Sequence, residues 1–325
     1  MIAIRCCCLF LAVGIAGARP SCGRGDESEQ GFLLRDGDRV ALLGGTLIER
    51  EQQFGYFETL LNVAHADLRV TFRNLGWSGD TVWGESRGLF EPQSGYERLL
   101  EQVRAADPTV LLIAYGNNEA FAGEPGLERF AAQYAKLLDD LHATQRRFVL
   151  LSPLEMEAGG VPGGLDAAEQ HAADYNRDVD KYAAAIRTLA DERGHAFIDQ
   201  RLDQRNLRST EEPLTSNGLH LTDAGYRETA GRLIDRLSPS AAPADFNWDT
   251  PPAAELRAAI IAKNQLYFHR WRPQNFTYLF GFRKYEQGQN AAEVPRFDPL
   301  IAAAEARIAE LAKAAALTMQ SPTSR

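Results

Sequence analysis

Short apolar runs alternate with longer amphipathic segments over most of the chain. The apolar runs that we expect to form strands lie at Val40–Leu43, Leu68–Leu75, Thr109–Tyr115, Arg147–Leu151 and Ala196–Asp199. Runs of this length, bounded by glycine, proline or polar residues, are typical of strands that are buried on both faces of a parallel sheet.

The segments between these runs predict helices. Helical spacing of apolar residues is found within Glu49–Ala64, Tyr96–Ala105, Gly126–Thr144 and Ala167–Arg193, and Thr222-Asp223 caps a further helix that ends at Leu237. Strands therefore alternate with helices five times. This order predicts an α/β fold, a doubly wound three-layer α/β/α sandwich with a five-stranded parallel sheet of the flavodoxin-like type.

The residues that follow the predicted sandwich have a different pattern. Ser238–Pro252 indicates a linker, and helices are expected at Ala253–Tyr267 and Pro299–Leu317. Between these helices, the strap His269–Lys284 combines aromatic residues with arginines. Two interpretations of the strap stay open: it packs on the sandwich with arginine stacked on tryptophan and tyrosine, or it forms a lid or wall of a functional site. We expect a sandwich domain at residues 37–238 and a C-terminal extension at residues 239–325.

The N-terminus has the pattern of an export signal. Residues 1–18 combine a basic residue, an apolar stretch and the small residues Ala16-Gly17-Ala18. Residues 19–36 are expected to be a flexible linker. The sequence thus predicts an exported protein, periplasmic or extracellular. Cys22 is the single cysteine after the signal, so a soluble form and a lipid anchor on Cys22 both stay open.

Composition and charge narrow the choice of partners. The chain has 325 residues, of which 45% are hydrophobic, and this is enough for a substantial core. Its net charge of −9 at pH 7 argues against nucleic acid or an anionic membrane surface as a partner. After the signal, no run reaches the about 18 apolar residues of a membrane span. The histidines lack metal-ligand spacing and no phosphate-binding glycine loop occurs, so no metal and no cofactor are expected.

Polar motifs follow four of the predicted strands. They are Gly45-Thr46, Ser78-Gly79, Asn117–Glu119 and, after the last strand, His220. Parallel strands end at one edge of the sheet, where ligands bind in such folds, so we expect one site there. Thr46 is either a helix N-cap or a nucleophile at this stage, since threonine is a favoured cap residue. Ser78 is an alternative nucleophile, with no histidine tied to it.

Four blocks in this order resemble the SGNH, or GDSL-type, hydrolase superfamily. They are Leu43–Leu47 at the Gly-Asp-Ser-Leu block, Asn74–Thr81 at the oxyanion-glycine block, Gly116–Glu119 at the Gly-x-Asn-Asp block and Asn217–His220 at the Asp-x-x-His block. The resemblance spans roughly Arg39 to Leu237. It implies the SGNH type of sandwich and an esterase activity.

The resemblance also implies roles for individual residues. Thr46 corresponds to the nucleophilic serine, and its neighbouring backbone to part of the oxyanion hole. His220 corresponds to the base, and Asn217 to the aspartate that orients this base. Gly79 and Asn118 correspond to the remaining oxyanion-hole residues.

Three positions depart from the pattern of the superfamily. Thr46 keeps a hydroxyl group, but its β-branch restricts χ1 and crowds the attack. Asn217 supplies no negative charge, and Gly45 replaces the aspartate before the nucleophile. Carboxylates that could replace the missing charge are Asp223, Glu119 and Glu155.

Two functions stay open. The first is an exported SGNH-type hydrolase that cleaves an acyl ester of a carbohydrate or lipid through a hydroxyl nucleophile, a histidine base and an oxyanion hole. The second is a catalytically impaired SGNH-fold protein, a pseudoenzyme that binds a glycan or other ligand without turnover. Both predict a small-molecule, glycan or lipid partner and no nucleic acid.

Overall fold

The sheet has the predicted architecture. The computed structural model describes residues 32–88, 94–158, 165–201, 213–241, 246–286 and 289–320, so the expectations for residues 1–18 and for Cys22 lie outside the described residues. Neighbouring strands are parallel, and their order is β2-β1-β3-β4-β5. The strands are β1 (Arg39–Gly44), β2 (Thr71–Asn74), β3 (Val110–Ala114), β4 (Arg147–Leu151) and β5 (Ala196–Ile198). This is the flavodoxin-like order, and it confirms the predicted fold class.

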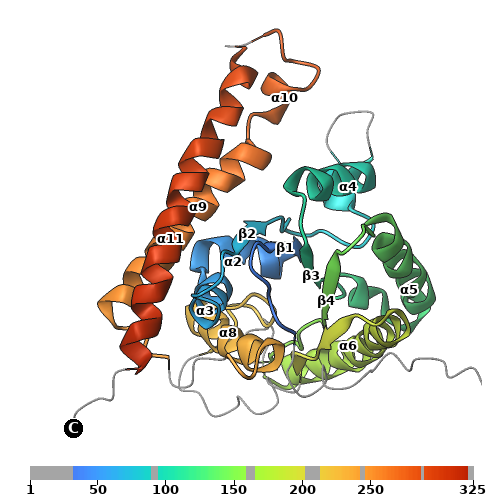
Figure 1. Ribbon diagram of the computed structural model, residues 1–325. Coiled ribbons are helices and arrows are strands. Elements are labelled where there is room, and N and C mark those ends of the chain that lie inside the picture. Colours follow the sequence, from blue (N-terminus) through green and yellow to red (C-terminus); the bar gives the residue numbers. More distant parts are fainter. Residues whose placement is uncertain are drawn as a thin grey trace, which may run out of the picture.

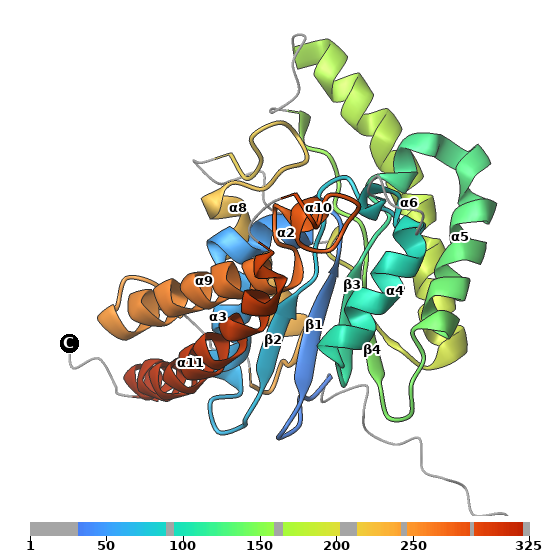
Figure 2. The ribbon, with the colours of Figure 1, turned by 90° about the horizontal axis from the view of Figure 1, so that it is seen from above.

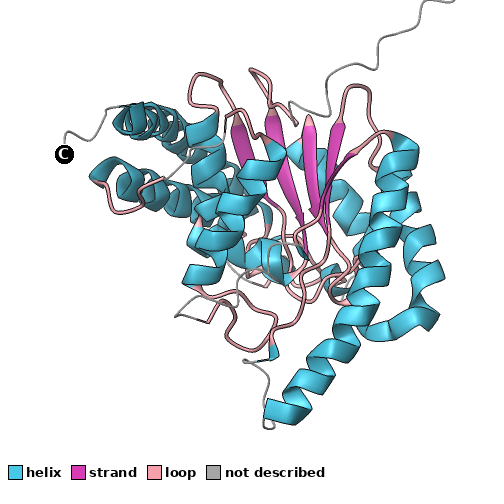
Figure 3. Ribbon diagram, turned by 90° about the horizontal axis from the view of Figure 1, so that it is seen from below, coloured by secondary structure: helices cyan, strands magenta, loops and turns pink. Residues whose placement is uncertain are grey.

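Two helical layers cover the sheet (Figure 1). Along β1, Ala41 and Leu43 belong to one apolar cluster, whereas Val40 and Leu42 belong to a second cluster on the other face. This alternation follows from the two-residue period of a strand. The helices of the first face are α4 (Gly95–Ala106), α5 (Gly123–Asp140) and α6 (Leu165–Arg193), and those of the second face are α2 (Thr46–Phe54), α3 (Tyr56–Ala64) and α8 (Asp223–Leu237). Figure 3 shows the strands enclosed between these helices.

The expectation of one helix over Glu49–Ala64 is wrong. The chain forms two helices there, because α2 ends at Phe54 and α3 begins at Tyr56. Gly55 between them has φ of 70°, a left-handed conformation that glycine adopts without a steric penalty. The apolar spacing continues across this break, so hydrophobic pattern alone does not reveal it.

The C-terminal extension packs against the sandwich. It contains α9 (Pro251–Trp271), α10 (Phe276–Leu279) and α11 (Phe297–Gln320), with the short 3-10 helix η4 (Asn290–Arg296) before α11. Figure 2 shows α9 and α11 side by side, next to α3 and β2. An apolar cluster joins Val63 of α3 to Ile260 and Ile308 of the extension. In the described residues, no helix has the length and apolar character needed to cross a membrane.

A buried ion pair also joins the extension to the sandwich. Nζ of Lys263 lies 2.6 Å from Oε1 of Glu58 and donates to the carbonyl of Phe72 at 3.1 Å. Both charged side chains are almost completely buried. Removing either partner would leave an uncompensated buried charge, so the position of α9 is strongly fixed.

Candidate active site

The hydroxyl of Thr46 lies at the carboxyl edge of the sheet, where β1 runs into α2. Gly45 is the N-cap position of α2, and no side chain makes a cap hydrogen bond there. Instead, Oγ1 of Thr46 accepts a hydrogen bond from the backbone N–H of Gly79 at 3.2 Å. The interpretation of Thr46 as a helix cap is therefore wrong, and its hydroxyl meets the loop that follows β2.

The loop after β2 is held tightly against α2. A Cβ on Gly76 would lie 2.1 Å from the backbone nitrogen of Glu49, so only glycine allows this approach. Asn74 fixes the start of the loop, because Nδ2 donates to the carbonyl of Ile48 at 2.6 Å and Oδ1 accepts from the N–H of Gly76 at 2.9 Å. These contacts determine where the N–H of Gly79 points.

The C-terminal extension supports the same loop from outside. The carboxylate of Glu49 accepts a hydrogen bond from the N–H of Ser78, and Arg272 binds Glu49 with Nη1 2.8 Å from Oε1. The guanidinium of Arg272 also stacks on the ring of Trp77, 3.5 Å from its centroid. Arg272 therefore packs this end of the strap on the sandwich, with arginine stacked on tryptophan, whereas Phe280 and Phe282 of the strap are exposed. Residues 269–284 are absent from the described lining of the pocket at Thr46.

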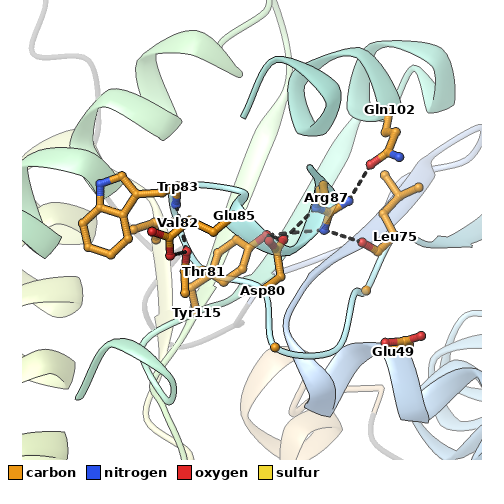
Figure 4. A network of polar contacts seen from close by, with 12 residues as sticks. Glu49, Leu75, Asp80, Thr81, Val82, Trp83, Glu85, Arg87, Gln102 and Tyr115 are labelled. Carbon is orange, nitrogen blue, oxygen red and sulfur yellow. Dashed lines mark hydrogen bonds and ion pairs between the residues drawn. The ribbon is translucent and has the colours of Figure 1, made fainter. Parts of the chain in front are cut away.

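A buried polar network supports the loop from inside (Figure 4). Asp80 Oδ2 accepts from Arg87 Nε at 2.6 Å and from the hydroxyl of Tyr115 at 2.8 Å. Arg87 further donates to the carbonyl of Leu75 at 2.8 Å and to Gln102 at 2.7 Å. The side chains of Asp80 and Arg87 are fully buried, so the pair holds both ends of the loop in a region of low dielectric.

Asn118 lies after β3, beside Gly45. Its Nδ2 donates to the carbonyl of Asp80 at 2.8 Å, and a Cβ built on Gly45 would lie 3.4 Å from this nitrogen. An amide nitrogen carries two hydrogens, so one donor remains for a ligand. The neighbouring Glu119 is buried, and this burial raises its pKa to about 7.

His220 is held by a turn whose hydrogen bonds define its tautomer. Asn217 Oδ1 accepts from the backbone N–H groups of Leu219 at 3.2 Å and His220 at 2.8 Å. The other end of the amide, Nδ2, therefore faces Nδ1 of His220 at 3.2 Å. An amide nitrogen only donates, so Nδ1 accepts and the proton of the neutral ring is on Nε2. Burial, together with the charge of Arg50, lowers the pKa of His220.

A single pocket brings most of the predicted residues together. Thr46, Asn118 and His220 line it, with a cavity of about 60 Å³, and further lining residues are Arg50, Asp80 and Tyr226. Gly79 and Asn217 are bonded to residues of this lining: the N–H of Gly79 to Thr46, and the amide of Asn217 to His220.

The proposed substitutes for the missing carboxylate have other partners. Oδ2 of Asp223 accepts from the hydroxyl of Tyr56 at 2.7 Å. Glu119 accepts from two backbone N–H groups, and Glu155 lies near Arg201. Ser78, the alternative nucleophile, is exposed and is absent from the described lining of the pocket.

Sequence reasoning missed Arg50 and the pairing of Arg272 with Glu49. Arg50 lies one helical turn after Thr46, and this spacing could have placed it on the same face of α2. No local signal connects Arg272 with Glu49, because 223 positions separate them.

Comparisons with known proteins identify a family and several similar solved structures. A family model described as the GDSL-like Lipase/Acylhydrolase family matches residues 44–228. No curated protein matches the chain. A solved structure of a catalytic mutant of Axe2, an acetylxylan esterase from Geobacillus stearothermophilus, is similar at 17% identity and a TM-score of 0.49, covering 63% of this chain and 95% of that one. The gut microbial diltiazem-metabolizing enzyme BT4096 is similar at 14% identity and a TM-score of 0.49, covering 65% and 49%.

Proposed function

The chain belongs to the GDSL-like lipase/acylhydrolase family, and from this premise we propose that it hydrolyses an acyl ester of a carbohydrate or lipid at the Thr46 pocket. The family membership supports a carboxylic ester hydrolase in general terms. The identity of the nucleophile and the substrate are parts of the proposal. So is export, which rests on the signal pattern of residues 1–18.

In the proposed reaction, Oγ1 of Thr46 attacks the carbonyl carbon of the ester while Nε2 of His220 takes the hydroxyl proton. The tetrahedral intermediate collapses when His220 returns this proton to the leaving alcohol oxygen, and the acyl group stays on Thr46. Water then attacks the acyl-threonine, His220 again takes and returns a proton, and a carboxylic acid leaves.

The observation that carries this proposal is the contact between Thr46 and the loop of Gly79. The N–H of Gly79 reaches Oγ1 at 3.2 Å, and Asn118 has an amide hydrogen to spare on the same side of the pocket. With the backbone N–H of Thr46, these donors are arranged to stabilise an oxyanion next to the attacking oxygen. Each such donor contributes a factor of about 10² to 10³ in kcat in enzymes of this kind.

Asn217 is expected to make the reaction slow. A base that takes a proton on Nε2 needs its own proton on Nδ1, whereas the amide of Asn217 favours the opposite tautomer. In a serine protease, the same replacement of aspartate by asparagine lowers kcat by about 10⁴. Turnover requires the minor tautomer of His220, and we expect a correspondingly low rate.

The orientation of the Asn217 amide also favours a second candidate function. A protein that only binds its ligand has no need for the Nδ1–H tautomer. Thr46 and Gly45 likewise replace the serine and the aspartate of the family pattern. This second candidate is a pseudoenzyme that holds a glycan or another ligand in the pocket without turnover.

Hydrolysis of short-chain p-nitrophenyl esters separates the two candidates. The purified chain is compared with Thr46→Ala, Thr46→Ser and His220→Ala, with the exposed residues Thr188 and His142 changed to alanine as matched controls. The hydrolase proposal predicts that Thr46→Ala and His220→Ala fall to background while Thr46→Ser and both controls stay active. Equal background rates in the parent chain and both alanine variants would contradict it and favour binding.

A further inference from the structure

The pocket contains a cationic side chain without a matching carboxylate. Arg50 lies on α2, one turn after Thr46, and lines the pocket together with His220. Its Nε is buried and has no hydrogen-bond partner among the described residues. A guanidinium without an ion-pair partner binds an anion that enters the pocket through its accessible N–H groups.

Two acidic residues, Asp80 and Glu119, line the same pocket as Arg50, and both are bound by other residues, while Oδ1 of Asp80 is buried without a partner among the described residues. Asp80 Oδ2 is bound by Arg87 and Tyr115. Glu119 uses one oxygen for the N–H of Val82 at 2.8 Å and the other for the N–H of Gly116 at 2.9 Å. Neither carboxylate forms an ion pair with Arg50 in the described parts of the chain.

The residue after Arg50 does not balance its charge either. Glu51 is fully buried, and this burial raises the pKa of its carboxyl group well above the usual range, so the neutral acid is favoured. Its Oε1 accepts from the N–H of Phe57 at 2.7 Å. The two positions where the superfamily pattern has aspartate are Gly45 and Asn217, which carry no charge.

Three further groups of the lining, those of Asn118, Thr46 and His220, can donate hydrogen bonds into the cavity. Asn118 has one free amide hydrogen, since the other is bound by the carbonyl of Asp80. Thr46 accepts from Gly79, which leaves its own hydroxyl hydrogen free. His220 carries its proton on Nε2, because Nδ1 accepts from Asn217. A cation surrounded by donors matches the bonding needs of a carboxylate.

We propose that Arg50 selects ligands that carry a carboxylate, so that the substrate is an ester with a carboxylate close to the scissile acyl group. The part of this inference that concerns ester cleavage rests on the proposed function, whereas the part that concerns carboxylate binding does not require cleavage. Arg50 lies one helical turn from Thr46 and lines the same pocket, so the carboxylate and the ester must be near neighbours in one molecule. The carboxylate belongs either to the acyl part, as in a half-ester of a dicarboxylic acid, or to the alcohol part, as in an acylated acidic sugar.

Binding is tested first, because it does not depend on turnover. The full chain is titrated with succinate and with neutral succinamide by calorimetry, as are Arg50→Gln, the charge-conserving Arg50→Lys and a control, Arg177→Gln. Arg177 is exposed and paired with Asp174. We expect the parent and the control to prefer succinate over succinamide by about tenfold or more, equal to the 1.4 kcal/mol of one charged contact. Arg50→Gln loses this preference and Arg50→Lys retains part of it.

Equal binding of succinate and succinamide by the parent would overturn the inference. An unchanged preference for succinate in Arg50→Gln would overturn it as well. Salt dependence adds a check that a purely structural role of Arg50 would not affect: the preference of the parent decreases as ionic strength rises, and the weak binding of Arg50→Gln does not.

Turnover identifies the source of the carboxylate. One arm compares the mono-p-nitrophenyl ester of succinic acid with p-nitrophenyl acetate, and the other compares an acetylated methyl glucuronide with the matching acetylated methyl glucoside. A higher kcat/KM for the charged member of either pair, reduced mainly through KM in Arg50→Gln, supports the inference and names the source. Equal rates within both pairs overturn the turnover part. If no ester is cleaved, the hydrolase proposal fails, and the calorimetric result alone decides whether Arg50 selects carboxylates.

Discussion

The loop that carries Gly79 and the turn that carries His220 face the same pocket, but different kinds of contact hold them. The loop is fixed by distant parts of the chain: Asp80 is bound by Tyr115, 35 positions away, and Glu49 by Arg272 of the C-terminal extension. The turn is shaped mainly by short-range bonds, such as that from the N–H of Ser216 to the carbonyl of His220 at 2.8 Å. Its distant partner is Glu157, whose N–H donates to the carbonyl of Gly218 at 2.8 Å.

The short-range bonds of the turn explain why Asn217 can stand at the aspartate position of the family pattern without moving His220. Asn217 Oδ1 accepts the two backbone N–H groups that shape the turn, and a carboxylate oxygen would accept them equally well. Asparagine therefore preserves the shape of the turn and the position of His220. The second side-chain atom, which faces Nδ1 of His220, changes from an acceptor to a donor, and only the proton-transfer chemistry is affected.

The largest effect is expected when the charge is restored on the turn. Asn217→Asp keeps the accepting oxygen and gives His220 a carboxylate partner at Nδ1, so the productive tautomer becomes dominant. We expect kcat on p-nitrophenyl esters to rise by about 10² to 10⁴. The matched control is Asn290→Asp, which makes the same change at an exposed position of the extension. An equal gain in both variants would show that general charge, and not the tautomer, is responsible.

The next largest effect is expected on the opposite side of the pocket. Asn118→Ala removes an amide donor that points at the developing oxyanion, so kcat should fall by about 10² to 10³ with little change in KM. Steady-state kinetics are best measured in the Asn217→Asp background, where the rate is higher. Asn290→Ala, an exposed asparagine of the extension, serves as the control. A loss confined to KM would contradict the role of Asn118 in the transition state.

A smaller effect is expected when the outer support of the loop is removed. Arg272→Ala releases Glu49 and uncovers Trp77, so the N–H of Gly79 loses its fixed direction. Misplacement of a positioning group lowers rates by about 10- to 100-fold. Hydrogen exchange of the peptide that contains residues 76–80 should increase in parallel. A general loss of stability would instead increase exchange in other parts of the chain as well.

The matched control for Arg272 is Arg270, which lies near the same end of α9. Arg270 is bound to Asp298 within the extension and makes no described contact with the loop. Arg270→Ala should leave both the rate and the exchange of the loop unchanged. If Arg272→Ala behaves like Arg270→Ala, the extension does not position the site.

The smallest effect concerns pH. Burial, with a further contribution from Arg50, lowers the pKa of His220 below its usual 6.5, so the neutral base is fully formed at neutral pH. The parent rate should rise as pH increases through this lowered pKa and stay level above it. In Asn217→Asp, a carboxylate favours the imidazolium and raises this pKa, so the rising part of the profile moves up by about one pH unit. Coincident profiles of kcat/KM would contradict this electrostatic coupling.

The fold was predictable from the sequence because it depends on local patterns. The short apolar run that became β1 and the capping residue Thr222 of α8 are visible within a few positions. The clustering of Thr46, Asn118 and His220 followed from topology, since parallel strands end at one edge. These parts of the site needed no knowledge of side-chain geometry.

The remaining features depend on contacts between distant residues or on the orientation of one side chain. Lys263 and Glu58 form a buried pair across 205 positions, and no local pattern indicates it. The break at Gly55 lies inside an uninterrupted apolar spacing. Whether Asn217 turns its oxygen or its nitrogen toward His220 depends on two backbone N–H groups, and the sequence leaves both orientations open.

The tautomer of His220 tests the central claim most directly, because the account assigns the weakness of the site to this proton. The ring nitrogens are observed by ¹⁵N NMR in ¹⁵N-histidine-labelled chain at a pH of about 8, and the signals of His220 are identified by their loss in His220→Gln. The account predicts a neutral ring with the proton on Nε2 in the parent and on Nδ1 in Asn217→Asp. A parent ring that already carries its proton on Nδ1 would contradict the account.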